Sequence, residues 1–194
     1  PSDILGYKMQ PDWPNHVERS WYFASDYNYY ATNFHKDMFL RNLNIPQGQH
    51  CKAITSGQPH ELIVDSLVKY QNTPKSDTIM WPHRYNDDKQ PDIAENLAME
   101  FDVVITQKLN LDKSAYYATM GKCKAIFSCA LHENLGISVM EAVLTGAIPI
   151  VPDRASYAEM YLPEFKYPSE WTESYEAYIE NKDNLMGFIQ EKLN

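Results

Sequence analysis

Two glutamates eight residues apart, Glu133 and Glu141, flank a glycine in the stretch HENLGISVMEA. An apolar segment typical of a buried strand comes first, so Gly136 is expected near the start of a helix. The first N–H groups of a helix have no helical partner and attract anions, and glycine lets a phosphate approach the backbone. The carboxylate of Glu141 would be repelled by a phosphate but can accept two hydrogen bonds from a cis-diol. The stretch therefore favours a phosphate at the helix start and sugar hydroxyls at Glu141.

Two cations form a second group. Arg84 follows the short apolar segment Thr78–Trp81, and Lys89 lies five residues further on. Taken alone, such residues are usually solvated surface charges. Next to the expected phosphate site, these two cations can stabilise the negative charge that develops on a phosphate oxygen when the phosphate is the leaving group. One well-placed donor contributes roughly 3 kcal/mol to such stabilisation.

The surrounding chain alternates short apolar segments with helical ones, which predicts an α/β fold built from parallel βαβ units. In such a sheet, ligands bind beyond the carboxyl ends of the strands, where both groups lie. The expected strands are 50–55, 78–81, 101–106, 125–128 and 147–151. The expected helices are 32–43, 60–70, 92–100, 113–122, 134–145, 156–161 and 173–193.

The second half of the chain resembles the donor-binding half of GT-B-fold retaining glycosyltransferases of family 4. That family has the pattern E-x-x-G-x-x-x-x-E-A, then a glycine, a proline-containing strand and a later glutamate. The matching residues are Glu133, Gly136, Glu141, Ala142, Gly146, Pro149 and Glu159. The segment PHRYNDDKQP is similar to the branch that includes the tRNA-queuosine mannosyltransferases, with Tyr85 in place of that branch's usual tryptophan.

The resemblance implies a GT-B architecture with a Rossmann-like donor domain, and a role for each matched residue. Arg84 and Lys89 would stabilise the leaving diphosphate, Glu133 would orient the transferred sugar, and Glu141 would hold the ribose. The donor would be a UDP- or GDP-sugar, with no cofactor and no metal. Attack would come from the same face as departure, without a protein nucleophile. The remaining donor-binding residues implied are His132, Asn134, Leu135, Gly136, Ile137 and Tyr157.

Three of the candidates near this site have an equally plain structural interpretation. His132 can contact the sugar or a phosphate oxygen, or be an ordinary loop histidine. His83, next to Arg84, has the same two interpretations: a site residue or an ordinary loop histidine. Tyr157 can reach a donor phosphate through its phenol, or simply pack in the core.

The polar stretch QNTPKSD at 71–77 predicts a domain boundary. Residues 78–194 would form the donor domain, and 1–77 the remnant of an acceptor-side Rossmann-like domain. The helix at about 173–193 is expected to pack back on the N-terminal part. In residues 1–77 we find no match to the glycine-rich first loop and early histidine of the family, so we expect either a minimal variant of the family or a natural polypeptide longer than 194 residues.

Composition narrows the class of protein. The net charge is −9, of which −8 falls in residues 78–194, so a uniformly basic nucleic-acid-coating protein is unlikely to be encoded. No apolar run reaches the length of a membrane span, and no signal peptide is visible. Three cysteines, an odd number without a CxxC motif, predict reduced thiols in a cytoplasmic protein, and no zinc site is expected.

Three functions remain open. The first is transfer of a hexose from a nucleoside diphosphate sugar to a hydroxyl. The second is glycosylation of a modified base in tRNA or viral DNA, for which the aromatic-rich first 30 residues would supply stacking surfaces, although they can equally form a core. The third is a non-enzymatic protein that binds a sugar nucleotide or serves in assembly. The eight aromatic residues concerned are Tyr7, Trp13, Trp21, Tyr22, Phe23, Tyr27, Tyr29 and Tyr30.

Overall fold

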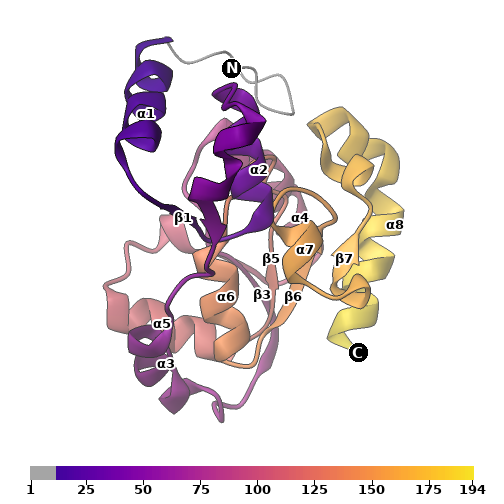
Figure 1. Cartoon of the computed structure of the whole chain (residues 1–194). Helices are drawn as coiled ribbons and strands as arrows, with labels where there is room; N and C mark the ends of the chain where they lie inside the picture. Colours follow the sequence, from indigo (N-terminus) through magenta and orange to yellow (C-terminus); the bar gives the residue numbers. More distant parts are fainter. Residues whose placement is uncertain (1–11) are drawn as a thin grey trace. The chain divides into compact units, whose positions relative to one another are not determined.

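The computed structural model describes residues 12–194, which divide into two compact units between Pro59 and His60 (Figure 1). The polar stretch in the sequence predicts a boundary later, at 71–77. The intervening helix α3 (Glu61–Leu67) belongs to the second unit, because its Leu67 is fully buried in a core that contains Met80. The polar stretch at 71–77 thus leads from α3 into the first strand of the second unit.

The N-terminal unit is a small βαβ arrangement preceded by a helix. Its two strands pair in parallel, and Tyr22, Leu40 and Leu43 are the centre of its core. The Thr32 hydroxyl caps the second helix by accepting a hydrogen bond from the His35 amide at 3.1 Å. The elements are α1 (Asp12–Ala24), β1 (Asn28–Tyr30), α2 (Asn33–Asn42) and β2 (Ala53–Thr55).

The C-terminal unit contains a five-stranded sheet in the order β4-β3-β5-β6-β7, with every neighbouring pair parallel. The strands are β3 (Ser76–Trp81), β4 (Val103–Ile105), β5 (Cys123–Phe127), β6 (Ile148–Pro152) and β7 (Lys166–Tyr167). Besides α3, the helices are α4 (Pro91–Leu97), α5 (Lys113–Lys122), α6 (Ile137–Leu144), α7 (Tyr157–Met160) and α8 (Tyr175–Leu193).

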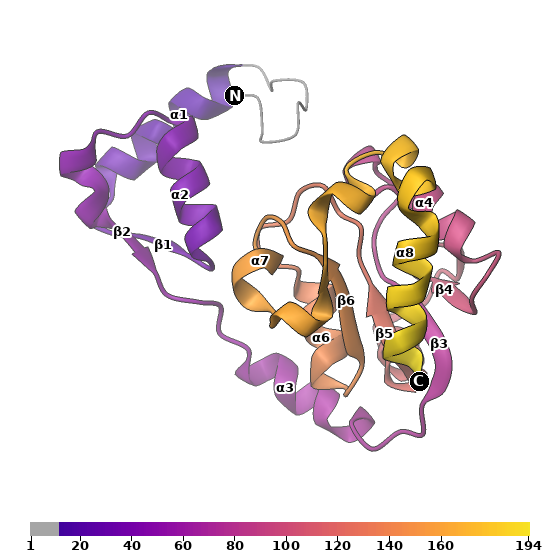
Figure 2. The same cartoon turned by 90° about the vertical axis from the view of Figure 1, so that its right-hand side faces the viewer.

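Both faces of this sheet are covered, because alternate strand residues point into two separate cores. Ile79 and Phe127 face the core formed with α4 and α8, whereas Met80 and Ile126 face the core formed with α3, α5 and α6. Figure 1 shows the strands between α3, α5 and α6 on one side and α8 on the other, and Figure 2 shows α8 along its own face of the sheet. These are the parallel βαβ units that the alternating pattern predicts, and the arrangement is compatible with the Rossmann-like fold that the resemblance implies.

Several elements differ from the expectations. The helix α1 and the strands β1 and β7 are not among the expected elements. The two strands are too short to show the alternation of apolar and polar residues that predicts a strand. Residues 50–52 form a 3₁₀ turn, and only Ala53–Thr55 is extended. The helix expected at 134–145 begins at Ile137. The helix α8 packs on the sheet of its own unit, with Leu185 and Ile189 in the core that holds Ile79.

Candidate functional site

The carboxyl ends of the parallel strands meet at one edge of the sheet, and two loops leave it from neighbouring strands. The loop after β3 carries Arg84 and Lys89, and the loop after β5 carries Glu133 and Gly136. The chain proceeds from β3 to β4 on one side and from β5 to β6 on the other. Ligands of open parallel sheets bind at such a switch in direction. The topology therefore brings the two predicted groups to the edge where a ligand is expected.

Lys89 joins the two loops. Its Nζ lies 3.1 Å from Asp88 Oδ2 and 3.2 Å from Glu133 Oε2, and it donates a hydrogen bond to the His132 carbonyl. Lys89 is buried, and both acidic partners are mostly buried. An ammonium has three N–H groups, and three acceptors surround this one. Lys89 therefore holds Glu133 and His132 in place in this structure.

Further bonds tie the same loops together along their length. The Leu131 amide donates to the Asp88 carbonyl at 2.8 Å, and the Gln90 side chain donates to the Cys129 carbonyl at 2.6 Å. Gln90 also donates to the Thr172 carbonyl at 2.7 Å. The loops after β3 and β5 thus form one hydrogen-bonded unit.

Arg84 differs from Lys89 because it is exposed. Within the described part of the chain, no carboxylate lies within ion-pair distance of its guanidinium. A guanidinium in this state can bind an oxyanion without first breaking an ion pair. Arg84 is therefore the candidate cation that is available to a ligand.

The turn before α6 has the geometry that its glycine predicts. Gly136 has φ 73° and ψ 50°, a left-handed conformation that disfavours other residues, and the helix begins at Ile137. The N–H groups of the first helical turn have no partner within the helix. Ile137 is half exposed, and Asn134 and Leu135 are partly buried.

The carboxylate of Glu141 is buried, with 7% of the residue exposed, and accepts a hydrogen bond from the Tyr117 hydroxyl at 2.6 Å. Burial, followed by this bond to Glu141, raises the pKa of Tyr117, so its hydroxyl stays protonated as the donor. One lone pair of the Glu141 Oε1 atom is thus used within the protein. The carboxylate has further lone pairs that can accept hydrogen bonds from hydroxyl groups.

Tyr157 lies beneath the Gly136 turn and is fully buried. Its hydroxyl donates to Ser128 Oγ at 3.2 Å, and burial raises its pKa well above the usual value for a tyrosine. The structure therefore places this phenol in a core contact, which is the second of the two interpretations offered for it.

His83 is also inside the protein. Its Nε2 lies 2.9 Å from Ser128 Oγ, and burial together with the charge of Lys89 lowers its pKa to about 3. The imidazole is therefore neutral at physiological pH. It precedes Arg84 directly, so it holds the start of the loop that carries this cation.

Three residues of the site, Asp88, Tyr117 and Ser128, are not indicated by the sequence patterns. Asp88 was hidden among neighbouring acidic residues, and the Tyr117–Glu141 contact spans 24 positions with no periodic signal. Ser128 alone had a recognisable signal, since it directly follows the carboxyl end of the buried strand β5.

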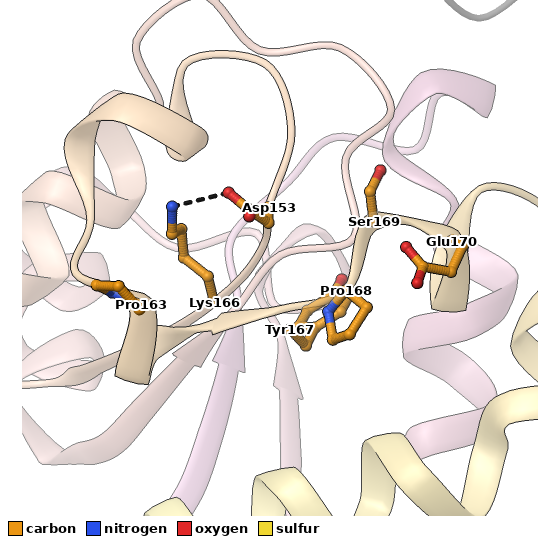
Figure 3. A pocket seen from close by; sticks show the side chains of 7 residues that line it. All are labelled: Asp153, Pro163, Lys166, Tyr167, Pro168, Ser169 and Glu170. Carbon is orange, nitrogen blue, oxygen red and sulfur yellow. Dashed lines mark ion pairs between the residues drawn. The ribbon is translucent and has the colours of Figure 1, made fainter.

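A hollow of about 470 Å³ lies at the same edge, between the loop after β6 and the segment after β7 (Figure 3). Asp153 and Lys166 form an ion pair of 2.7 Å beside it. The seven side chains that line this hollow include none of the predicted site residues. Arg154, which follows Asp153 in the chain, is buried, and its guanidinium donates to the Thr172 carbonyl at 3.0 Å.

In residues 12–194, no group of three histidine, cysteine or acidic side chains is arranged to hold a metal ion. No helix in that range has the length and apolar character needed to cross a membrane.

The sequence matches no family model. It is similar to tRNA-queuosine alpha-mannosyltransferase of Drosophila melanogaster, with 25% identity over 119 residues. The aligned part is 46% of this chain and 32% of the relative, so the chain spans about a third of the relative's length. Together with the Rossmann-like sheet, this distant similarity supports a relation to glycosyltransferases.

Proposed function

We propose that this protein is a retaining glycosyltransferase that moves a hexose from a nucleoside diphosphate sugar to a hydroxyl. The observation that carries the proposal is the position of Glu133 and the Gly136 turn beside the loop of Arg84 and Lys89, at the switch point of a parallel sheet. Anion-binding N–H groups, cations and carboxylates for hydroxyls meet there, which is what a sugar nucleotide requires.

Each residue would have one task. The amides at the start of α6 and the guanidinium of Arg84 would receive the diphosphate and stabilise the charge that grows on the leaving oxygen. Glu133, held by Lys89, would accept hydroxyls of the transferred sugar, and Glu141 those of the ribose. Departure and attack on one face of the sugar would retain its configuration. The residues present supply acceptors and cations for this, and no step in the scheme uses a metal.

A donor screen tests this proposal. Purified protein is titrated with UDP-, GDP- and ADP-sugars in a thermal-shift assay, and a ligand at about 100 times its Kd adds roughly 2.7 kcal/mol of stability. We expect a rise in melting temperature with a UDP- or GDP-sugar and retention of configuration in the transfer product. No shift with any sugar nucleotide contradicts the proposal.

Variants of Glu141 then separate binding from folding. Glu141→Ala is expected to weaken donor binding roughly 10- to 100-fold in calorimetry, because hydrogen bonds to a charged group are worth about 1.5–3 kcal/mol. Glu141→Gln keeps an acceptor for Tyr117 and should fold normally, yet still bind the donor more weakly. Glu180→Ala, on the exposed surface of α8, is the matched control. Equal affinities in all three variants would remove Glu141 from the site.

A second candidate concerns the acceptor. The N-terminal unit has a hollow of about 430 Å³ whose lining includes Trp21, Tyr27 and Tyr29, and each of these rings is more than half exposed. Exposed aromatic rings can stack on nucleobases. The name of the similar mannosyltransferase says that it acts on tRNA-queuosine. We propose a modified nucleoside in nucleic acid as an alternative acceptor. Activity on tRNA that falls steeply with salt would support it, and equal activity on free sugars and tRNA would contradict it.

A third outcome separates catalysis from binding alone. A protein that serves only in binding or assembly would bind the donor without hydrolysing or transferring it. A normal calorimetric isotherm with no product over prolonged incubation, across hydroxyl acceptors and tRNA, would favour that function over the enzyme.

A further inference from the structure

The hydroxyl of Ser128 occupies a central position at the switch point. Ser128 is fully buried directly after β5, and its Oγ lies 2.9 Å from His83 Nε2 and 3.2 Å from the Tyr157 hydroxyl. Its carbonyl also accepts a hydrogen bond from Tyr167 at 2.8 Å. The side chain of Ser128, which follows β5, thus contacts residues that follow the two neighbouring strands, β3 and β6.

The donors and acceptors around the Ser128 hydroxyl determine the direction of each of its hydrogen bonds. The Tyr157 O–H and the Ala130 N–H both donate to Ser128 Oγ, the latter at 3.3 Å. A hydroxyl has two lone pairs and one hydrogen, so its own hydrogen is left for His83 Nε2. The neutral imidazole then carries its proton on Nδ1. All the bonding capacity of the hydroxyl is used within the protein.

Tyr157 connects this hydroxyl to the turn before α6. A Cβ placed on Gly136 would lie 2.5 Å from Tyr157 Cε1 and 3.1 Å from its hydroxyl oxygen. The ring therefore lies directly against the backbone of the turn, closer than any side chain at Gly136 would allow. The depth at which Tyr157 is held determines where this turn and its amides can lie.

His83 connects the same hydroxyl to the other loop. It directly precedes Arg84, it is 5% exposed, and its ring contacts Trp81 edge-on with centroids 5.4 Å apart. The bond to Ser128 therefore fixes the loop after β3 at the residue before the available cation.

We propose that Ser128 is a positioning residue that sets the Gly136 turn and the Arg84 loop at a fixed separation. Its hydroxyl holds Tyr157 against the turn and His83 at the base of the loop. The proposal rests on the proposed function, in which the amides and the guanidinium receive one diphosphate. Groups that act together must be held within about 0.5 Å of the productive geometry, and a misplacement of about 1 Å can lower a rate about 100-fold.

The first test compares kinetic constants of three variants. Ser128→Ala removes the central hydroxyl, and Tyr157→Phe keeps the ring against Gly136 but removes one bond. Thr145→Val is the matched control, because Thr145 is a fully buried residue of the same unit whose hydroxyl donates only to the Ala142 carbonyl, at 2.8 Å. We expect kcat to fall at least tenfold in Ser128→Ala and less in Tyr157→Phe, with KM changed less than kcat, and wild-type kcat in Thr145→Val.

The double variant Ser128→Ala with Tyr157→Phe tests whether the two residues act as one unit. If Tyr157 acts through Ser128, the double variant loses no more kcat than Ser128→Ala alone. Losses that multiply, or a loss in Ser128→Ala no larger than in Thr145→Val, overturn the proposal.

The second test does not depend on activity. In NMR spectra of the labelled protein without ligand, Ser128→Ala is expected to shift both the Gly136 amide signal and the Arg84 Nε–H signal, whereas Thr145→Val leaves both in place. Unchanged Gly136 and Arg84 signals in a folded Ser128→Ala protein overturn the positioning role. A wild-type protein that binds no sugar nucleotide contradicts the proposed function instead, and the NMR result still decides whether Ser128 couples the two segments.

Discussion

Arg84 and Lys89 lie five residues apart on one loop, yet their surroundings are opposite. Lys89 is 9% exposed and surrounded by Asp88, Glu133 and a backbone carbonyl. Arg84 is exposed and, among residues 12–194, has no carboxylate within ion-pair distance. Similar charges can therefore serve different purposes within one loop.

This comparison changes how the two cations are expected to work. A buried ion pair costs desolvation and gains its value from geometry, so Lys89 acts mainly by holding Glu133. An exposed guanidinium without an ion pair contributes little to folding and keeps most of its N–H donors for a ligand. Substitutions of Lys89 should therefore reduce stability and activity together, whereas those of Arg84 should reduce activity alone.

The largest effect is expected for Lys89→Met. It leaves Asp88 and Glu133 mostly buried and without their shared cation, which should lower the free energy of unfolding by about 3 kcal/mol. Urea unfolding followed by circular dichroism measures this. An unfolding free energy within about 0.5 kcal/mol of the wild type would show that Lys89 has no such structural role.

Arg84→Ala comes next, with the loss confined to turnover. With saturating donor, kcat should fall about 100-fold, which corresponds to about 2.7 kcal/mol of transition-state stabilisation. The unfolding free energy should stay within about 0.5 kcal/mol, since exposed substitutions without special contacts change it little. Wild-type turnover, or a large loss of stability, would end the contrast with Lys89.

The buried, neutral state of the neighbouring His83 predicts that the stability of the protein depends on pH. Its pKa falls from 6.5 to about 3 on folding, so between these values the unfolded chain takes up a proton that the folded protein does not. The free energy of unfolding should therefore decrease as the pH is lowered below about 6.5, and this group should contribute about 1.4 kcal/mol per pH unit. His83→Gln should show a shallower fall in urea unfolding at pH 7, 6 and 5. Parallel curves for the two proteins would show that His83 is not buried as a neutral group.

The smallest effect is expected for Lys182→Met, which breaks a partly exposed ion pair of 3.1 Å with Glu100. The side chains of Lys182 and Glu100 are 24% and 42% exposed, so solvent screens the ion pair. The free energy of unfolding should therefore fall by less than about 1 kcal/mol. A loss as large as that of Lys89→Met would mean that burial does not distinguish the two lysines.

Local features of the sequence were sufficient for most of the C-terminal unit. The helix over Lys113–Lys122 has the predicted bounds, because Asp112 caps it and a strand with β-forming residues follows. The start of α6 was placed three residues too early, since the left-handed conformation of Gly136 delays the helix. The boundary between units was misplaced by composition, because α3 is held by a contact with residues far along the chain.

The site shows the same division in more detail. Three features follow from the local sequence: cations come after β3, carboxylates flank a glycine near the start of α6, and both loops leave the same edge of a parallel sheet. These properties depend on neighbours in the chain and on the parallel order of strands. Three other features arise from long-range packing: Lys89 is paired with acidic residues, Arg84 has no ion pair among the described residues, and Tyr157 is held by Ser128. The Lys89–Glu133 and His83–Ser128 contacts span 44 and 45 positions, and no local pattern encodes a pairing over such distances.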